Sequence, residues 1–137
     1  MGLNSVACRF RLYRQSPGEQ AVDLATQSDE DILAVVNPLM DNLMEGSTEI
    51  DYEKHVRDFT DRLKSMVSEE GLKRMCEHYQ ADVGYFTDRE LLSIFRRSDS
   101  VGVVWRQATS KSDDELIASV VVVEQDGRYL VDHALVY

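Results

Sequence analysis

Two runs of apolar residues near the C-terminal end of the chain are separated by a short polar turn. Residues 116–123 and 129–137 are rich in Val, Leu, Ile and Tyr, and Asp126-Gly127 lies between them. A type I′ turn needs a positive φ angle at both central residues, and Asp-Gly between β-branched segments meets that need. The pattern therefore predicts an antiparallel β-hairpin with a two-residue turn.

The register of this hairpin predicts two apolar faces. With Gln125 opposite Arg128, one face carries Leu116, Ala118, Val120 and Val122 opposite Tyr137, Leu135, His133 and Val131. The other face carries Ile117, Ser119, Val121 and Val123 opposite Val136, Ala134, Asp132 and Leu130. A hairpin with one solvated side alternates apolar and polar residues. Because this one does not, we expect helices to cover one face and further sheet or a second subunit to cover the other.

Residues 28–84 have the spacing of amphipathic helices. Ser28 can cap a first helix with an acidic first turn, and Gly46 is expected to end it. A second helix is predicted from about Asp51, and a third is capped by Ser68 and ends before Gly84. Their apolar positions recur at helical spacing: Ile32, Val35, Val36, Leu39, Met40, Leu43 and Met44, then Tyr52, Val56, Phe59, Leu63 and either Met66 or Val67, then Leu72, Met75, Cys76 and Tyr79.

Residues 87–97 fit two structures. Thr87 and Glu90 have the spacing of a capping box, and Leu91, Leu92 and Phe95 suit a helix. The same residues, followed by a Ser-Asp-Ser turn and the apolar run 101–109, also suit one strand of a hairpin. We favour the strand, because residues 101–109 need an antiparallel neighbour.

The N-terminal residues predict one further strand. Val6, Cys8, Phe10 and Leu12 alternate with outward-facing residues that include Arg9 and Arg11, as in a half-exposed edge strand. Residues 15–27 then form a linker. We therefore expect a single domain with three parts: an N-terminal strand and linker over 1–27, helices over 28–84 and an antiparallel sheet over 85–137.

The charge of the chain is strongly acidic and unevenly distributed. The net charge is −10 over 137 residues, and residues 15–53 hold ten acids with no Lys or Arg. An acidic surface repels phosphate, so we expect no nucleic-acid partner. A solvated helix face is the favoured explanation of the acids, and a docking surface for a basic partner is the alternative.

The remaining composition bears on the compartment. Two cysteines make no disulfide framework, which is typical of a reduced cytoplasmic protein. No apolar run approaches the roughly 20 residues that span a bilayer, so no membrane association is expected. The chain carries no phosphate-binding loop, dinucleotide glycine motif or G-x-S-x-G element, and we expect no cofactor.

The order of elements, helices first and long antiparallel strands last, resembles the NTF2-like (cystatin-like) α+β superfamily, in particular its small bacterial members of unassigned function. The resemblance covers roughly residues 29–137. Its motifs are Asp-Val-Gly-Tyr-Phe at 82–86, Val-Val-Trp-Arg at 103–106 and Asp-Gly-Arg-Tyr-Leu-Val-Asp at 126–132. It implies N-terminal helices packed on a curved antiparallel sheet that forms a cone with a pocket inside, and a homodimer through the outer sheet face.

Two ionisable residues in the hairpin are the candidates for catalysis. If Asp132 is buried among Val121, Val123 and Leu130, it would have a raised pKa, as a general acid or base requires. The favoured explanation is that Asp132 lies near an open edge or bonds to a neighbouring side chain. His133 lies on the opposite face, where a hydrogen-bonded core or interface histidine is the simpler explanation. The candidates for lining a pocket are aromatic: Tyr52, Tyr79, Tyr85 and Trp105. At their helical or strand spacing, plain core positions are the favoured explanation. Cys76 and His78 diverge on a helix, so no metal site is expected.

The sequence leaves two classes of function open, because the fold alone does not decide activity. The favoured hypothesis is a non-catalytic homodimeric domain that binds a small apolar molecule or a protein partner. The alternative is a small cofactor-independent isomerase, cyclase or dehydratase of the ketosteroid-isomerase-like type, with Asp132 or His133 as the base. A purely structural dimerisation module is a third hypothesis.

Overall fold

The long first helix determines how the helical layer sits on the sheet. The computed structural model describes residues 23–137, in which α2 spans Asp29–Glu49. Ser28 caps it, its Oγ accepting a hydrogen bond from the N–H of Asp31 at 3.1 Å. The helix ends at Ile50, which has a left-handed φ of 54°, and not at Gly46 as predicted. A Cβ at Gly46 would lie 2.6 Å from the backbone nitrogen of His55, so this glycine permits close packing inside a continuing helix.

The predicted second helix is two short helices, α3 (Tyr52–Val56) and α4 (Asp61–Lys64). The break between them has a tertiary cause. The Val131 N–H donates to the Asp58 carbonyl at 2.7 Å, and the Thr60 N–H donates to the Val131 carbonyl at 2.9 Å. Residues 58–60 therefore run alongside Val131 of the last strand and form a short parallel bridge centred on Phe59. A continuous helix could not offer these backbone groups to a strand.

The other helical elements flank these. The third predicted helix is α5 (Glu69–Val83), capped by Ser68 and followed by Gly84. A short 3-10 helix, η3 (Leu24–Thr26), lies in the predicted linker. The predicted N-terminal strand over residues 6–13 lies outside the described residues. None of the helices within residues 23–137 has the length and apolar character needed to cross a membrane.

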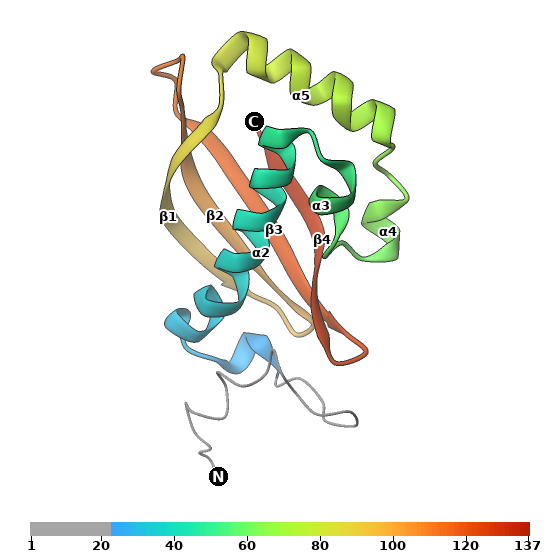
Figure 1. Cartoon of the computed structure of the whole chain (residues 1–137). Coiled ribbons are helices and arrows are strands. Elements are labelled where there is room, and N and C mark those ends of the chain that lie inside the picture. The colour runs from blue at the N-terminus through green and yellow to red at the C-terminus, as the bar shows by residue number, and fades with distance from the viewer. Residues whose placement is uncertain (1–22) are drawn as a thin grey trace.

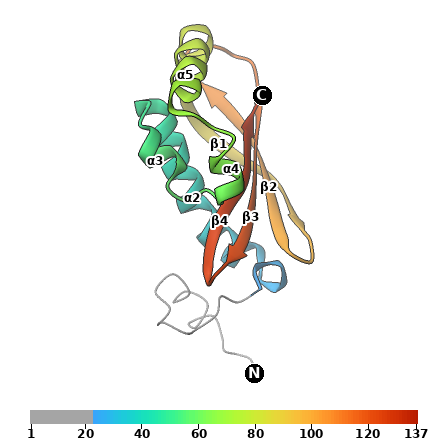
Figure 2. The ribbon, with the colours of Figure 1, turned by 90° about the vertical axis from the view of Figure 1, so that its right-hand side faces the viewer.

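Four antiparallel strands follow the helices in sheet order β1-β2-β3-β4: β1 (Phe86–Arg96), β2 (Ser100–Thr109), β3 (Leu116–Gln125) and β4 (Arg128–Val136). Residues 87–97 thus form the strand that we favoured, because β1 pairs with β2 almost along its full length. The fold is α+β, as predicted. The helices lie on one face of the curved sheet (Figures 1 and 2).

The hairpin turn agrees with the prediction and its register agrees in part. Asp126 and Gly127 have φ angles of 53° and 78°, as a type I′ turn requires. Gln125 pairs with Arg128 and Val122 with Val131, but Val121 then pairs with His133. Asp132 is therefore the extra residue of a β-bulge.

This bulge exchanges the faces of the final residues. Val120 pairs with Ala134 and Ala118 with Val136 on the face toward the helices, while Ser119 pairs with Leu135 on the other face. The predicted placement of His133 and Leu135 beside Val120 and Ala118 is wrong. A shift of one residue moves each following side chain to the opposite face.

The core lies between α2 and the inner sheet face, by which we mean the face that the helices cover. Its members are almost fully buried: Ile32, Val36, Met40, Val56, Val101, Val103, Trp105, Ala118, Val120, Val122 and Val131. Every second residue of β2 and β3 enters this core. The helices predicted for one face of the hairpin are therefore present, and they cover the inner face.

Candidate functional site

Asp132 is held at the bulge by residues of α4. Its Oδ1 accepts hydrogen bonds from the Thr60 hydroxyl at 2.7 Å and from Arg62 Nε at 3.0 Å, and Arg62 also donates to the Asp132 carbonyl. Partial burial acts to raise the pKa of Asp132, but the bonds from Arg62 and Thr60 outweigh it and lower the pKa below its usual value. A general acid or base at this position would need a raised pKa, and the ion pair with Arg62 acts against it. The contacts match the favoured explanation, in which Asp132 bonds to a neighbouring side chain. This arrangement suits a structural clamp between α4 and β4.

His133 lies on the outer sheet face, the face that carries no helix in the described part of the chain. It is exposed, and its Nε2 is 3.3 Å from the Ser119 hydroxyl on β3. It is not the core residue that the unbulged register predicted. The two candidate catalytic side chains thus leave the hairpin in different directions, Asp132 toward α4 and His133 toward the outer face.

Two of the predicted pocket-lining aromatics are engaged in contacts among the helices. The Tyr52 hydroxyl donates to the Val67 carbonyl at 2.8 Å. The Tyr79 hydroxyl shares a 2.7 Å hydrogen bond with Ser47, and its ring stacks on Phe86 with centroids 4.6 Å apart. Burial raises the pKa of Tyr79. These tyrosines tie helices to each other and to β1.

The other two aromatics differ in exposure. Tyr85 is 51% exposed, and Trp105 is buried on the inner face. Arg89 lies over the Trp105 ring, 4.9 Å from its centroid, a cation–π contact. Two surface hollows lie beside α2, one at the start of β1 and one at the β3–β4 turn, and neither is lined by any of the four predicted aromatic residues.

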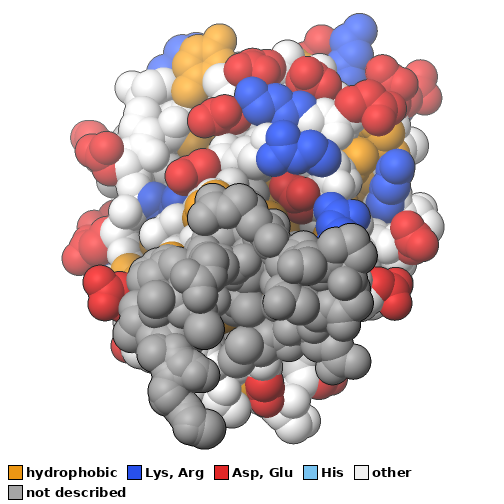
Figure 3. Space-filling model, turned by 60° about the horizontal axis from the view of Figure 1, so that its bottom comes forward, with side chains coloured by type: hydrophobic (Ala, Val, Ile, Leu, Met, Phe, Trp, Pro, Cys, Tyr) orange, Lys and Arg blue, Asp and Glu red, His pale blue; other side chains and the backbone are white. Residues whose placement is uncertain are grey.

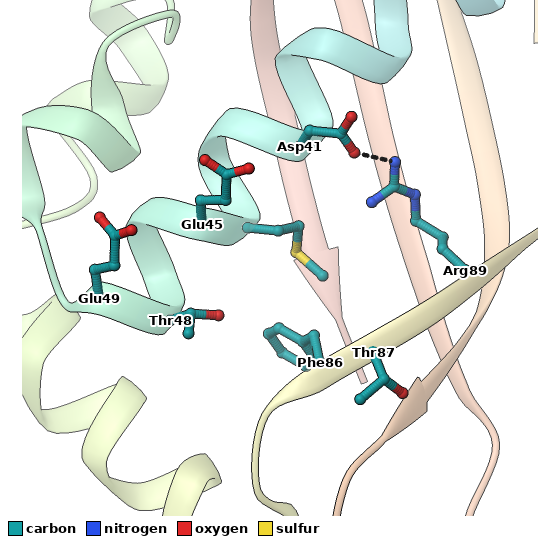
Figure 4. Close-up of a pocket in the computed structure, with 8 residues that line it drawn as sticks. Asp41, Glu45, Thr48, Glu49, Phe86, Thr87 and Arg89 are labelled. Atoms are coloured by element: carbon teal, nitrogen blue, oxygen red, sulfur yellow. Dashed lines mark hydrogen bonds and ion pairs between the residues drawn. The ribbon is translucent and has the colours of Figure 1, made fainter.

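The first hollow, of about 210 Å³, lies between α2 and the start of β1 (Figure 4). Three acids of α2 line it four residues apart, Asp41, Glu45 and Glu49. Arg89 binds Asp41 at 2.7 Å, and Lys54 lies 3.1 Å from Glu45 and 3.3 Å from Glu49. The acids are therefore paired with bases of the same chain. Their i, i+4 spacing was visible in the sequence, where it predicted only an acidic helix face.

Buried polar groups lie beside this hollow. The Gln107 side chain is fully buried, and its Nε2 donates to the carbonyls of Thr87 and Asp88 at 3.1 and 3.3 Å. These carbonyls belong to an irregular stretch of β1, where the ladder with β2 is interrupted. Gln107 thus serves as a substitute for the missing strand contacts. Within residues 23–137 no group of three His, Cys, Asp or Glu side chains is placed to hold a metal ion.

The described elements leave the outer sheet face without a helix (Figure 2), and this face carries exposed apolar side chains. Its exposed members are Phe95 at 52%, Ile117 at 38%, Leu135 at 49% and Tyr137 at 63%. Val104, Val121 and Val123 are half-buried between them. The sequence predicted that this hairpin has two apolar faces, and that general pattern signalled the surface. The bulge decided which C-terminal residues belong to it.

The charged residues of the outer sheet face lie close together and form ion pairs with one another. Arg106 on β2 contacts Glu90 on β1 at 2.8 Å and Glu115, just before β3, at 3.4 Å. Ser119 and His133 supply polar groups between the apolar side chains. On the part of the surface in Figure 3 that grey atoms do not cover, acidic and basic side chains are interspersed with small separate hydrophobic spots.

Comparison with known proteins finds similarity in structure only. No protein-family model matches this chain, and no curated protein matches it. An NTF2-like protein of unknown function from Pseudomonas putida KT2440 is similar, with 15% identity and a TM-score of 0.47 over 74% of this chain and 82% of that chain. A SEC-C motif containing protein from Rhodopseudomonas palustris is similar over 94% of this chain and 88% of that chain, with 12% identity and a TM-score of 0.46. The first carries the family name that the sequence resemblance predicted.

Proposed function

We propose that this protein is a non-catalytic homodimeric binding domain, and that the second copy packs on the outer sheet face. The observation that carries the proposal is the set of exposed apolar side chains on a sheet face that no helix of residues 23–137 covers. Monomeric proteins seldom expose contiguous apolar patches of more than a few hundred Å², and larger ones mark interaction sites. In a monomer, residues 23–137 would leave this face in water.

The size of the face suits a stable dimer. The four strands are 9 to 11 residues long. At ~3.4 Å per residue and ~4.8 Å between strands, the sheet spans roughly 30 by 20 Å. Its accessible area is then of the same order as the ~800 Å² that each partner contributes to a standard interface.

The charge of the face favours a second copy over an unrelated charged partner. Two chains with a net charge of −10 each repel one another at most approaches. The outer sheet face is an exception, because its centre is uncharged and Arg106 is already paired with Glu90 and Glu115. A twofold axis through such a face brings apolar residues of both copies together. No contact described above favours the isomerase alternative, since Asp132 is bound by Arg62.

Sedimentation velocity tests the proposal. The wild-type chain is expected to sediment at about twice its 15.6 kDa mass at micromolar concentration. Leu135→Glu and Phe95→Glu each place an acid on the outer sheet face and are expected to weaken dimerisation at least tenfold. Met75→Glu is the matched control, because Met75 is 54% exposed on α5, and it should remain dimeric.

Two outcomes contradict the proposal. One is a wild-type chain that stays monomeric up to about 100 µM, a concentration at which even weak specific dimers form. The other is a dimer that persists unchanged in both face variants. Circular dichroism of each variant shows that the fold is kept, so a change in mass reports the interface alone.

A further inference from the structure

A second hollow, of about 460 Å³, lies between the middle of α2 and the tip of the β3–β4 hairpin. Small-molecule sites in proteins occupy roughly 300 to 1,000 Å³ and are lined by apolar side chains with a few polar groups. On the α2 side the lining residues are Ala34, Val35, Pro38 and Leu39. On the hairpin side it is lined by Gly127, Arg128 and Tyr129, and Asp58 completes the lining.

The hollow exists because small residues face each other across it. Ala34 projects little from α2, and Gly127 has no side chain at the hairpin turn. Gly127 has a φ of 78°, a conformation that glycine adopts without strain. The turn therefore favours glycine at this position, and Gly127 adds no side chain to the lining of the hollow. Tyr129, which is 9% exposed, provides a rigid apolar wall.

The charged groups of this hollow are unequal in exposure. Only Asp58 and Arg128 among its lining residues carry a charge. The Asp58 side chain is 16% exposed, and Arg57 and Arg128 approach it at 3.3 and 3.7 Å. The Arg128 side chain is 64% exposed. Two guanidinium groups thus share one largely buried carboxylate, and the three groups together carry one positive charge.

This combination discriminates between ligand charges. A cation entering the hollow would meet the Arg128 guanidinium and a carboxylate that is already paired with Arg57 and Arg128. An anion can bind the exposed guanidinium of Arg128 through charge-assisted hydrogen bonds, often bidentate for a carboxylate. The net charge of −10 acts against anions at long range, but at physiological ionic strength exposed charges are screened beyond about 8 Å. The charged groups nearest to the hollow therefore decide which ligand charge it favours.

We propose that this hollow binds a small amphipathic carboxylate, with its alkyl chain against Ala34 and Tyr129 and its carboxylate on Arg128. Its lining belongs to α2, residue 58 and the hairpin turn, whereas the proposed dimer face is formed by the outward side chains of the strands. The two proposals can therefore fail separately. The site also lies apart from the acidic hollow beside β1, whose charges would repel a carboxylate.

Calorimetric titration of the full chain with decanoate, below its micellar concentration, tests this site. Binding is expected to be saturable with a Kd on the order of 0.1 to 1 mM, given the efficiency expected of so small a ligand. Decanol and decyltrimethylammonium have the same alkyl chain without the negative charge, and they are expected to bind at least tenfold more weakly. In a ¹⁵N NMR titration, decanoate should shift the amide resonance of Gly127.

Two variants locate the site. Arg128→Gln removes the guanidinium and is expected to weaken decanoate binding about tenfold, whereas Arg74→Gln removes an arginine that is 71% exposed on α5 and should change nothing. Ala34→Leu fills the hollow and should abolish binding, whereas Ala81→Leu on α5 should not. The proposal is overturned if all three probes bind alike, or if Arg128→Gln or a folded Ala34→Leu chain binds decanoate as the wild type does.

Discussion

The inner and outer faces of the sheet are built by the same four strands, yet they meet different surroundings. On the inner face Val101, Val103, Val120 and Val122 are at most 1% exposed, whereas Phe95, Ile117, Leu135 and Tyr137 on the outer face are 38% to 63% exposed. Both faces are apolar. The difference lies in what covers them, since α2 packs on the inner face and the described residues put no helix on the outer face (Figure 2). An apolar strand pattern therefore predicts that a face will be covered, and leaves open what covers it.

The largest expected effect comes from placing the same charge on each face in turn. Val120 is 1% exposed on the inner face, and its neighbour Val121 is half-buried on the outer face. Val120→Asp buries an unpaired carboxylate and is expected to lower the free energy of unfolding by about 4 kcal/mol or more. Val121→Asp is expected to cost about 1 kcal/mol or less in the monomer. Urea unfolding followed by circular dichroism measures both.

Since dimerisation would itself add to the stability of the wild type, both substitutions are best compared within the Leu135→Glu chain. Equal losses of stability in the two variants would mean that the faces are covered equally. That result would remove the distinction on which the dimer proposal depends.

A smaller effect distinguishes His55, which is buried beneath α2, from His133 on the outer sheet face. The Nδ1 of His55 donates to the Leu43 carbonyl at 2.8 Å, and the His55 ring meets Phe59 edge-on. Burial lowers the pKa of His55 below its usual value, although the bond to Leu43 acts in the opposite direction. The unfolded chain then binds a proton that the folded chain does not. Stability is present above about pH 6.5 and is lost as the pH falls toward the folded pKa.

The slope of this loss can reach about 1.4 kcal/mol per pH unit for one proton. His55→Gln is expected to remove the slope between about pH 6.5 and 5, while His133→Gln, a change on the exposed outer face, should keep it. Urea midpoints at several pH values measure the slope. A wild-type chain with no slope in this window would show that the imidazole is not secluded from water.

The smallest expected effect concerns the bulge that assigns residues to the two faces. Asp132→Asn keeps the shape of the side chain and removes its charge, so the ion pair with Arg62 is lost. Because the pair is partly exposed, the expected loss at pH 7 is about 1 kcal/mol or less. The pKa of Asp132 is lowered, so its contribution is present above about pH 4 and disappears as the pH falls through the folded pKa.

Thermal melts at pH 7 and pH 3 measure this contribution. Asp82→Asn, on the exposed surface of α5, is the matched control and should be neutral at both pH values. If Asp132→Asn destabilises the chain equally at the two pH values, the charge of Asp132 is not the source of its effect, and the clamp acts through the shape of the bulge instead.

The local elements were predictable where short-range chemistry decides them. Ser28 caps α2 and Ser68 caps α5 because their hydroxyls lie three residues before free N–H groups. Asp126-Gly127 forms the turn because both residues adopt positive φ. The candidate site was less predictable. The pairing of Asp132 with Thr60 and Arg62 joins residues about 70 positions apart, and no spacing along the chain signals it.

The sequence by itself therefore determined the starts of α2, α3 and α5, the strands β2, β3 and β4, the hairpin turn and the presence of two apolar faces, because each depends on neighbours within a few residues. The tertiary structure decided where the second predicted helix breaks and where β4 bulges, through the contacts of residues 58–62 with Val131 and Asp132. Those contacts form only when α3, α4 and β4 meet. One extra residue at that meeting point places His133 and Leu135 on the outer face and Ala134 and Val136 against the core.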